Sequence, residues 1–543
     1  MELSITRWAS VSSIVLLLSC GTQQLHAQWV APGALVQIGG EPEERIRLGQ
    51  LLGTDSTRRF LFRSVSSLSP GLGAQSRLRV TLFAPELRMV NNSALPFSLN
   101  DGPLWAGRGS NMLITAGVGL SYKSVRVIIA PQLTTSENLP FQVIPYPQND
   151  ASGRDVWSNP FHPAGSSIDL PLRFGDAPIR RVVPGQSSLT IDVRGVSFGV
   201  ATENLWWGPG IRNAIVLSNN AEGFPHAFIQ TKNAVRTPFG TFDAQWILGE
   251  LRESNFFDNN PANDLRSLSG LIVVWTPLSD SGLSLGMART VFAPAARSGV
   301  SLSAAFDFLR DVGHPNTDAR DSAKGPGPDQ VFSFFGRWVF PKTGFEAYAE
   351  WARFEEPISF RDLLEFPGHS QAYTLGLQWA HPLARGGTLR LQAEGSDLEP
   401  DPSIRVRPVA TTYTSRSVVQ GYTNLGKSLG ANIGPGSSSQ WLAADYFAPK
   451  VRFGVFVGRI RWDDATLWEP IVPQVKNEDI SLFGGLRGSV AYRSVRLSLE
   501  YTHTVRLDYL YQDKIADPAA GTHAGVDIGN RTLSLTLSTA VAR

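Results

Sequence analysis

Cysteine is almost absent from this chain, because Cys20 is the only one among 543 residues. A single cysteine excludes an internal disulfide, so a disulfide framework cannot stabilise the fold. Long apolar runs are also missing: beyond residue 27 no stretch approaches the ~18 consecutive apolar residues that indicate a membrane-spanning helix. The sequence therefore predicts neither a small disulfide-rich domain nor a helical membrane protein.

The chain lacks an excess of either charge, since 49 basic and 47 acidic residues give a formal net charge of +2. No basic stripe is present, so we expect no nucleic-acid partner. The eight histidines are scattered without zinc-site spacing, and no glycine-rich phosphate loop precedes a helix. We therefore expect no metal and no cofactor.

Residues 1–27 have the pattern of a cleaved signal peptide, with Arg7 before the apolar run 11–18 and a cleavage site after Ala27. The run is too short to span a bilayer as a helix. Cys20 follows Leu17-Leu18-Ser19, which resembles a bacterial lipobox, although Leu18 replaces the usual small residue. The segment predicts export, and Cys20 is a candidate lipidation site.

Strict alternation of apolar and polar residues is the main periodic signal of the remaining chain. Successive side chains of a strand point to opposite faces, so each such segment has an apolar side and a polar side. A soluble sandwich alternates in the same way. Export, and tryptophans close to expected strand ends, favour a transmembrane antiparallel β-barrel over residues 76–543, with lipid around it, in a Gram-negative outer membrane. The clearest segments are 189–194, 389–394, 495–501 and 533–538.

The number of strands follows from the length of this region. At about 26 residues for each strand with its connection, the barrel has about 18 strands, and 16 is the alternative. Long loops are expected at 136–188, 255–266, 312–328 and 399–440. The chain ends at Arg543, whereas such barrels commonly end in an aromatic residue.

Residues 28–75 predict a small helical element on the periplasmic side. Leu48, Leu51 and Leu52 have the spacing of one helical face, and Pro42 and Gly53 are placed to begin and end the helix. Residues 58–63 predict a second short helix.

The segment 203–210 places Trp206 and Trp207 directly before a Gly-Pro-Gly turn, and Ser218-Asn219-Asn220 follows soon after. Indole rings beside amides and hydroxyls suit a surface that stacks on sugar rings. The alternative is a pair of aromatic girdle residues at the membrane interface.

On these residues the chain resembles the capsule assembly Wzi family. Segments 203–210 and 217–221 carry the resemblance, and the blocks at 91–105, 286–290 and 420–436 extend it. It implies a non-enzymatic, lectin-like outer-membrane barrel that binds capsular or extracellular polysaccharide and attaches it at the cell surface, beside other capsule-export components. Whether the motif residues contact sugar or shape a loop inside the barrel stays open. The candidate site residues are Glu203, Asn204, Trp206, Trp207, Gly208, Pro209, Gly210, Ser218, Asn219, Asn220, Arg289 and Tyr422.

Two other functions are compatible with the sequence. A diffusion porin has the same alternation, since its lumen is polar too. A hydrolase would use a serine with a histidine base and an orienting amide, for which Ser218, Asn219 and His226 are candidates.

Overall fold

The computed structural model describes residues 28–33, 35–55, 60–69, 75–141, 168–258, 260–309, 328–355, 359–384, 386–405, 411–415, 417–463, 478–511, 513–517 and 522–539. The signal peptide with Cys20, most of the expected loop 312–328 and the C-terminal Arg543 lie outside these residues. Within the described ranges, no helix is long and apolar enough to cross a membrane.

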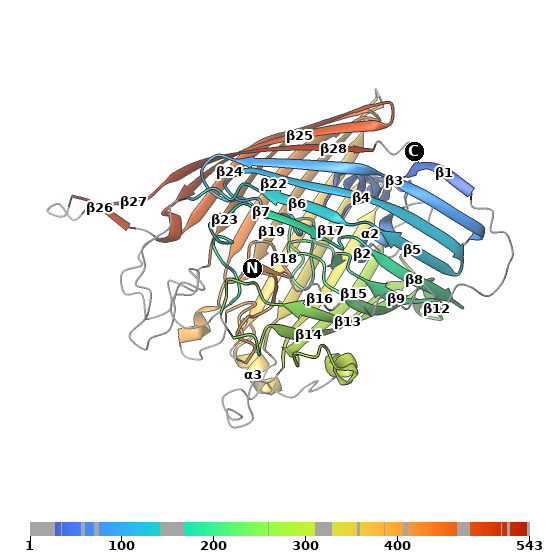
Figure 1. Cartoon of the computed structure of the whole chain (residues 1–543), viewed down its shortest axis with the longest axis horizontal. Helices are drawn as coiled ribbons and strands as arrows, with labels where there is room; N and C mark the ends of the chain where they lie inside the picture. Colours follow the sequence, from blue (N-terminus) through green and yellow to red (C-terminus); the bar gives the residue numbers. More distant parts are fainter. Residues whose placement is uncertain are drawn as a thin grey trace, which may run out of the picture.

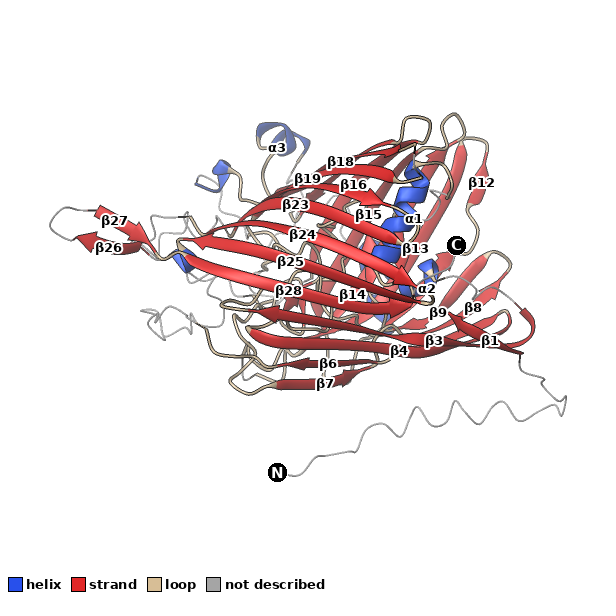
Figure 2. Cartoon of the chain, turned by 90° about the horizontal axis from the view of Figure 1, so that it is seen from above, coloured by secondary structure: helices blue, strands red, loops and turns tan. Residues whose placement is uncertain are grey.

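One antiparallel sheet closes on itself to form a barrel (Figures 1 and 2). Its first strands are β3 (Gln75–Asn92), β4 (Gly109–Lys123), β5 (Val125–Ile129), β6 (Gln132–Ser136), β7 (Ile179–Val183), β8 (Ser188–Val193), β9 (Val196–Ala201), β11 (His226–Thr231), β12 (Val235–Thr237), β13 (Gly240–Arg252) and β14 (Leu265–Pro277). The others are β15 (Leu283–Pro294), β16 (Asp329–Phe340), β17 (Phe345–Arg353), β18 (Gln371–Pro382), β19 (Thr388–Asp397), β22 (Ser438–Phe447), β23 (Val451–Arg461), β24 (Ile480–Tyr492), β25 (Val495–Leu507) and β28 (Ile528–Thr539).

The barrel closes where the last wall strand, β28, pairs with the first, β3. The wall is continuous across the connection 202–225, because β9 pairs with β11. The sheet has 22 strands. β1 is not a wall strand, because it only pairs in parallel with one end of β3. Each of the pairs β5–β6, β7–β8 and β11–β12 is one interrupted strand and fills a single position in the wall. The described residues therefore form a barrel of 18 strands, which confirms the larger of the two predicted counts.

Side-chain exposure alternates along the wall as the sequence predicts. On β18, Leu375 and Leu377 point outward and are 53% and 50% exposed, whereas the inward Thr374 and Gln378 are buried. On β17 the inward Glu346 is bonded to Arg337 at 2.9 Å. An apolar outer face and a polar inner face separate cleanly, as lipid outside and water inside require.

The two ends of the barrel differ in the length of their connections. At one end the strands join by short turns, such as Ser124 between β4 and β5 and residues 493–494 between β24 and β25. At the other end the connections are long, as in 202–225 and 398–437. Barrels of this kind have short turns on the periplasmic side and longer loops outside. The end with short turns is called the turn end and lies to the right in Figure 2; the end with long connections is called the loop end and lies to the left.

Smaller elements surround or fill the barrel. Before the first wall strand lie β1 (Gln28–Gly33), α1 (Glu41–Leu51), β2 (Phe62–Ser64) and α2 (Val65–Leu68). The long connections carry β10 (Leu205–Trp207), η3 (Leu302–Leu309), α3 (Phe360–Glu365), η4 (Pro402–Arg405), β20 (Thr423–Asn424), β21 (Lys427–Ser428), η5 (Tyr509–Tyr511), β26 (Asp513–Asp517) and β27 (Thr522–Gly525).

Helix α1 confirms the predicted first helix. Leu48 and Leu51 are buried against Ala380 and Phe447 of the wall, so the helix lies within the lumen near the turn end (Figure 2). The predicted second helix at 58–63 is wrong in its described part, because residues 62–64 form strand β2, and a helical turn begins only at Val65. Strand β10 supplies the backbone partner for β2, and this tertiary pairing overrides the local preference.

Candidate functional site

Both tryptophans of the motif are buried inside the barrel, at 1% and 0% exposure. In β10, Trp206 pairs with Arg63 and Trp207 with Phe62 of β2. The Trp207 indole nitrogen donates to Gln245 Oε1 at 2.8 Å. Neither ring lies in a membrane girdle, and neither offers an open stacking face. The pair lies in the connection 202–225 between β9 and β11, which fills part of the lumen and is called the plug.

The Gly-Pro-Gly turn brings the plug close to the wall. Gly208 has φ +106°, and a Cβ there would lie 2.9 Å from Glu350 Oε2, so this position requires glycine. Arg63 donates to the carbonyl oxygens of Gly208 and Gly210 at 3.2 and 3.4 Å. Burial lowers the pKa of Arg63 to about 10, although its ion pair with Glu43 opposes this. Pro209 is buried between the two glycines.

The polar residues at both ends of the motif bind chain segments rather than open space. Glu203 accepts from the backbone nitrogen and the hydroxyl of Ser66 at 2.8 and 2.7 Å, and burial raises the pKa of this carboxyl. Asn204 and Gln186 exchange two hydrogen bonds of 2.8 and 3.0 Å. These contacts fix the start of the plug to α2 and to the wall.

Ser218, Asn219 and Asn220 each join a different part of the chain. The Ser218 hydroxyl donates to Gly430 O at 2.5 Å. The Asn219 amide nitrogen donates to Ile38 O at 2.9 Å, and that of Asn220 to Ser428 O at 3.0 Å. His226 Nδ1 instead contacts its near neighbour Phe224 at 2.8 Å. In the described residues no hydrogen bond links Ser218 to His226, so the structure does not assemble the catalytic arrangement considered from sequence.

The last two candidates, Tyr422 and Arg289, lie on opposite sides of the barrel wall. Tyr422 is fully buried in the lumen, and its hydroxyl is 2.9 Å from Thr290 Oγ1. Arg289 points outward from β15, where it donates to Phe308 O of η3 at 2.8 Å and to Gln330 Oε1 at 2.7 Å. Arg289 therefore holds η3 against the outer face of the barrel and does not join the luminal residues.

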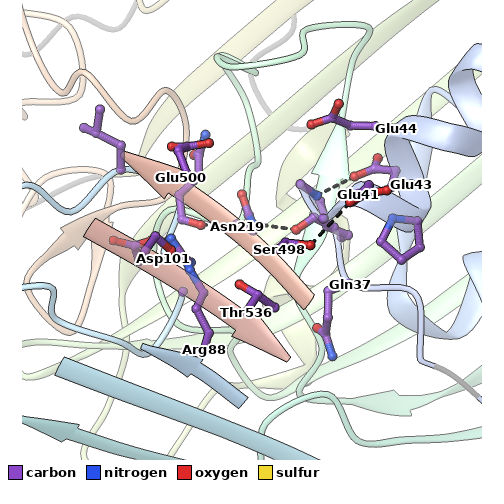
Figure 3. A pocket seen from close by; sticks show the side chains of 18 of the residues that line it. Gln37, Glu41, Glu43, Glu44, Arg88, Asp101, Asn219, Ser498, Glu500 and Thr536 are labelled. Atoms are coloured by element: carbon purple, nitrogen blue, oxygen red, sulfur yellow. Dashed lines mark hydrogen bonds and ion pairs between the residues drawn. The ribbon is translucent and has the colours of Figure 1, made fainter. Parts of the chain in front are cut away.

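The plug divides the lumen between two cavities. The loop-side cavity has a volume of about 170 Å³, and Asn220 is part of its lining. The turn-side cavity has a volume of about 310 Å³, and Asn204 and Asn219 are part of its lining (Figure 3). Phe97 lines both cavities. The motif residues thus form the partition between two candidate binding spaces.

Aromatic rings and polar groups both line the loop-side cavity. Its rings belong to Phe97, Trp105, Phe141, Trp462 and Tyr509. Lys427 also lines it, and its ammonium group donates to Leu104 O at 2.6 Å; burial lowers the pKa of this group to about 8.

Two buried polar atoms in the lining, Trp105 Nε1 and Thr504 Oγ1, have no hydrogen-bond partner among the described residues. Buried polar groups are normally paired, so these two groups keep unused hydrogen-bonding capacity beside the cavity. Trp105 and Lys427 lie within the blocks 91–105 and 420–436 that carry the family resemblance, but no sequence pattern indicated that they meet.

The turn-side cavity is bounded on one side by α1 and a network of ion pairs. Glu44 is bonded to Arg390 at 2.6 Å and to Arg452 at 2.7 Å, and Asp445 is bonded to Arg390 and Arg487, both at 2.7 Å. Burial alone would raise the pKa of Glu44, but the three guanidinium groups outweigh it and hold the pKa well below its usual range. The charges of α1 are therefore matched by wall residues, and this holds the helix inside the lumen.

A closed barrel with an apolar outer face, a polar lumen and one end of long loops defines an outer-membrane β-barrel protein. Within that class, the chain belongs to the capsule assembly protein Wzi family, whose family model matches residues 185–502. The matched region includes the motif, the wall strands from β11 to β24 and Tyr422. No curated protein matches this chain.

Similar folds occur among solved structures. The chain resembles Wzi of Escherichia coli, an outer membrane protein involved in group 1 capsule assembly and described as a carbohydrate-binding β-barrel, with 11% identity and a TM-score of 0.52 over 84% of this chain and 85% of that one. OccK2 of Pseudomonas aeruginosa has 10% identity and a TM-score of 0.39 over 87% of this chain and 100% of that one. At these identities the likeness to Wzi concerns the fold.

Proposed function

We propose that this protein binds capsular or extracellular polysaccharide at the outer membrane and helps to attach it at the cell surface, without catalysing a reaction. The observation that carries the proposal is the loop-side cavity, which combines several aromatic rings with two unpaired polar atoms, Trp105 Nε1 and Thr504 Oγ1. Sugar rings stack on aromatic faces, and their hydroxyls donate and accept hydrogen bonds. The loop-side cavity lies at the loop end of the barrel, which faces the cell exterior, where a capsule lies.

Family membership supports this function, and so does the description of the E. coli relative as a carbohydrate-binding barrel. We infer that the motif residues act by shaping the partition between the cavities, because Trp206 and Trp207 are buried and bonded to other segments. A diffusion porin fits less well, since α1 and the segment 202–225 both occupy the described lumen.

The test is saccharide binding by the purified full-length protein in lipid nanodiscs, measured by calorimetry with acidic capsular polysaccharide fragments. Trp462→Ala should weaken binding roughly two- to tenfold, because one stacked ring contributes about 0.5–1.5 kcal/mol. The matched control is Trp379→Ala, since Trp379 lies on the outer face and is 36% exposed. Unchanged binding by Trp462→Ala would contradict the proposed site. Absence of any saccharide binding, together with ion conductance in planar bilayers, would favour the porin instead.

A further inference from the structure

The turn-side cavity contains one arginine whose guanidinium forms no salt bridge in the described structure, although the carboxylates of Glu500, Glu394 and Glu44 attract it from a greater distance. Arg88 is bonded to Asp101 at 2.6 Å, and Arg390, Arg452 and Arg487 share Glu44 and Asp445. Arg47 and Arg63 are paired with Glu346 and Glu43. Of the arginines that line this cavity in the described structure, Arg212 alone has no carboxylate or carbonyl partner for its guanidinium.

The Arg212 guanidinium lies over an aromatic ring. It lies 5.4 Å from the ring centroid of Trp441, and Arg487 lies 5.3 Å from the same centroid. Trp441 is 5% exposed and lines the cavity, and its indole N–H has no partner in the described residues. A buried donor without a partner destabilises the fold unless a bound molecule or water accepts from it.

Two residues that line the same space carry unpaired acceptors. Asn100 Oδ1 and Asn219 Oδ1 are buried without a described partner, and both residues line the cavity. The opposite wall carries hydroxyl groups along β25 and β28. These belong to Ser498, Thr502, Thr532, Ser534, Thr536 and Ser538. Figure 3 shows Asn219 between the carboxylates of α1 on one side and Glu500 and Asp101 on the other.

The backbone around Arg212 is held rigidly, so its guanidinium is presented from a fixed support. The backbone nitrogens of Ile211, Arg212 and Asn213 donate to the carboxylate of Glu394 at 2.6, 2.9 and 2.9 Å. The carbonyl oxygen of Arg212 accepts from Asn100 Nδ2 at 2.8 Å and from Asn432 Nδ2 at 2.7 Å. A binding group fixed in advance loses less entropy when its ligand arrives.

We propose that the turn-side cavity is a second saccharide site, which takes a sugar bearing a carboxylate and holds that carboxylate on Arg212. This inference rests on the proposed function and names its ligand class. A guanidinium binds a carboxylate through two parallel charge-assisted hydrogen bonds, and the indole N–H, the amide oxygens and the hydroxyl wall match the hydroxyls of the sugar. Glu500 lines the same cavity and attracts Arg212, so the site suits no more than one carboxylate per bound sugar unit.

The cavity extends along β28 to Ser538, next to the final strand residue at the turn end. A saccharide therefore reaches it from the periplasmic side, whereas the loop-side cavity faces the cell exterior.

The experiment is calorimetry of the full-length protein in nanodiscs with two probes. One is a glucuronate-containing tetrasaccharide, and the other is the same oligosaccharide with its carboxylates reduced to hydroxymethyl groups. Wild type should bind the acidic probe at two sites per chain. Arg212→Gln should weaken one of these sites roughly ten- to hundredfold and leave binding of the reduced probe unchanged. The affinity of Arg212→Lys for the acidic probe should lie between those of wild type and Arg212→Gln, because lysine keeps the charge but loses the two-bond geometry.

Arg252→Gln is the matched control, because Arg252 lies outside both cavities and is bonded to Glu250 at 2.7 Å. Thermal unfolding verifies that each variant is folded. The inference is overturned if Arg212→Gln binds the acidic probe like wild type, or if the reduced probe binds the second site equally well. Trp462→Ala distinguishes failure of this inference from failure of the proposed function. If Trp462→Ala removes one binding site and Arg212→Gln has no effect, the loop-side site is supported and the turn-side site is refuted. No binding of either probe by wild type refutes both.

Discussion

Replacing Trp207 with alanine should release the plug from the lumen and leave the barrel wall intact. The indole is fully buried, packs close to Gly270, and donates to Gln245. Truncation of a buried tryptophan costs about 3–5 kcal/mol, since transfer free energy is lost and a cavity remains. Gln245 Oε1 also loses its donor, although Gln245 Nε2 still donates to Gln230 at 2.9 Å. The wall strands keep their backbone ladder, so the loss falls on the motif segment.

Hydrogen exchange of the full-length protein measures this local loss. The amide of Ser218, which donates to Leu429 O at 2.8 Å, should exchange roughly a thousandfold faster, because about 4 kcal/mol corresponds to three powers of ten. Amides of the paired strands β13 and β14 should keep their wild-type rates. Trp379→Ala removes a ring from the outer face and should leave Ser218 protected. Wild-type exchange at Ser218 in Trp207→Ala, or equal effects of the two variants, would refute the reasoning.

Two further predictions concern the support of the plug. Glu44→Gln should loosen α1 and speed the exchange of its amides at least tenfold, because Arg390 then keeps only one carboxylate partner. The pKa of Glu44 is depressed in the folded protein, so the stabilisation by this carboxylate is complete above pH ~4.5 and is lost only as the pH falls well below that value. Loss of exchange protection of the α1 amides, relative to the unfolded chain at the same pH, already when the pH is lowered from 7 to 5 would contradict this. Gly208→Ala should lower the thermal unfolding temperature more than Gly386→Ala. Both glycines have positive φ, but only at position 208 would the new Cβ lie against Glu350. Equal decreases in the two variants would show that the close approach to Glu350 does not matter.

The sequence alone predicted the class of fold and most of its local pattern. Alternation in 389–394 of β19 and 495–501 of β25 predicted which residues face lipid, because the period of two is a property of the strand itself. The spacing of Leu48 and Leu51 predicted α1 and its buried face. Length and strand dimensions gave the count of 18. The motif at 203–210 indicated the family, which the match over residues 185–502 establishes.

The tertiary structure decided where the chemistry lies. Trp206 and Trp207 looked like a sugar platform or a membrane girdle, yet they are buried, because β2 pairs with β10 and Leu217 accepts from the Trp207 amide. Arg289 was a candidate site residue through the family resemblance, and the register of β15 places it on the outer face, against η3. The two cavities combine residues hundreds of positions apart, such as Arg212 with Trp441. Burial and pairing of this kind depend on contacts that closing the barrel creates, and local sequence cannot encode where those distant partners meet.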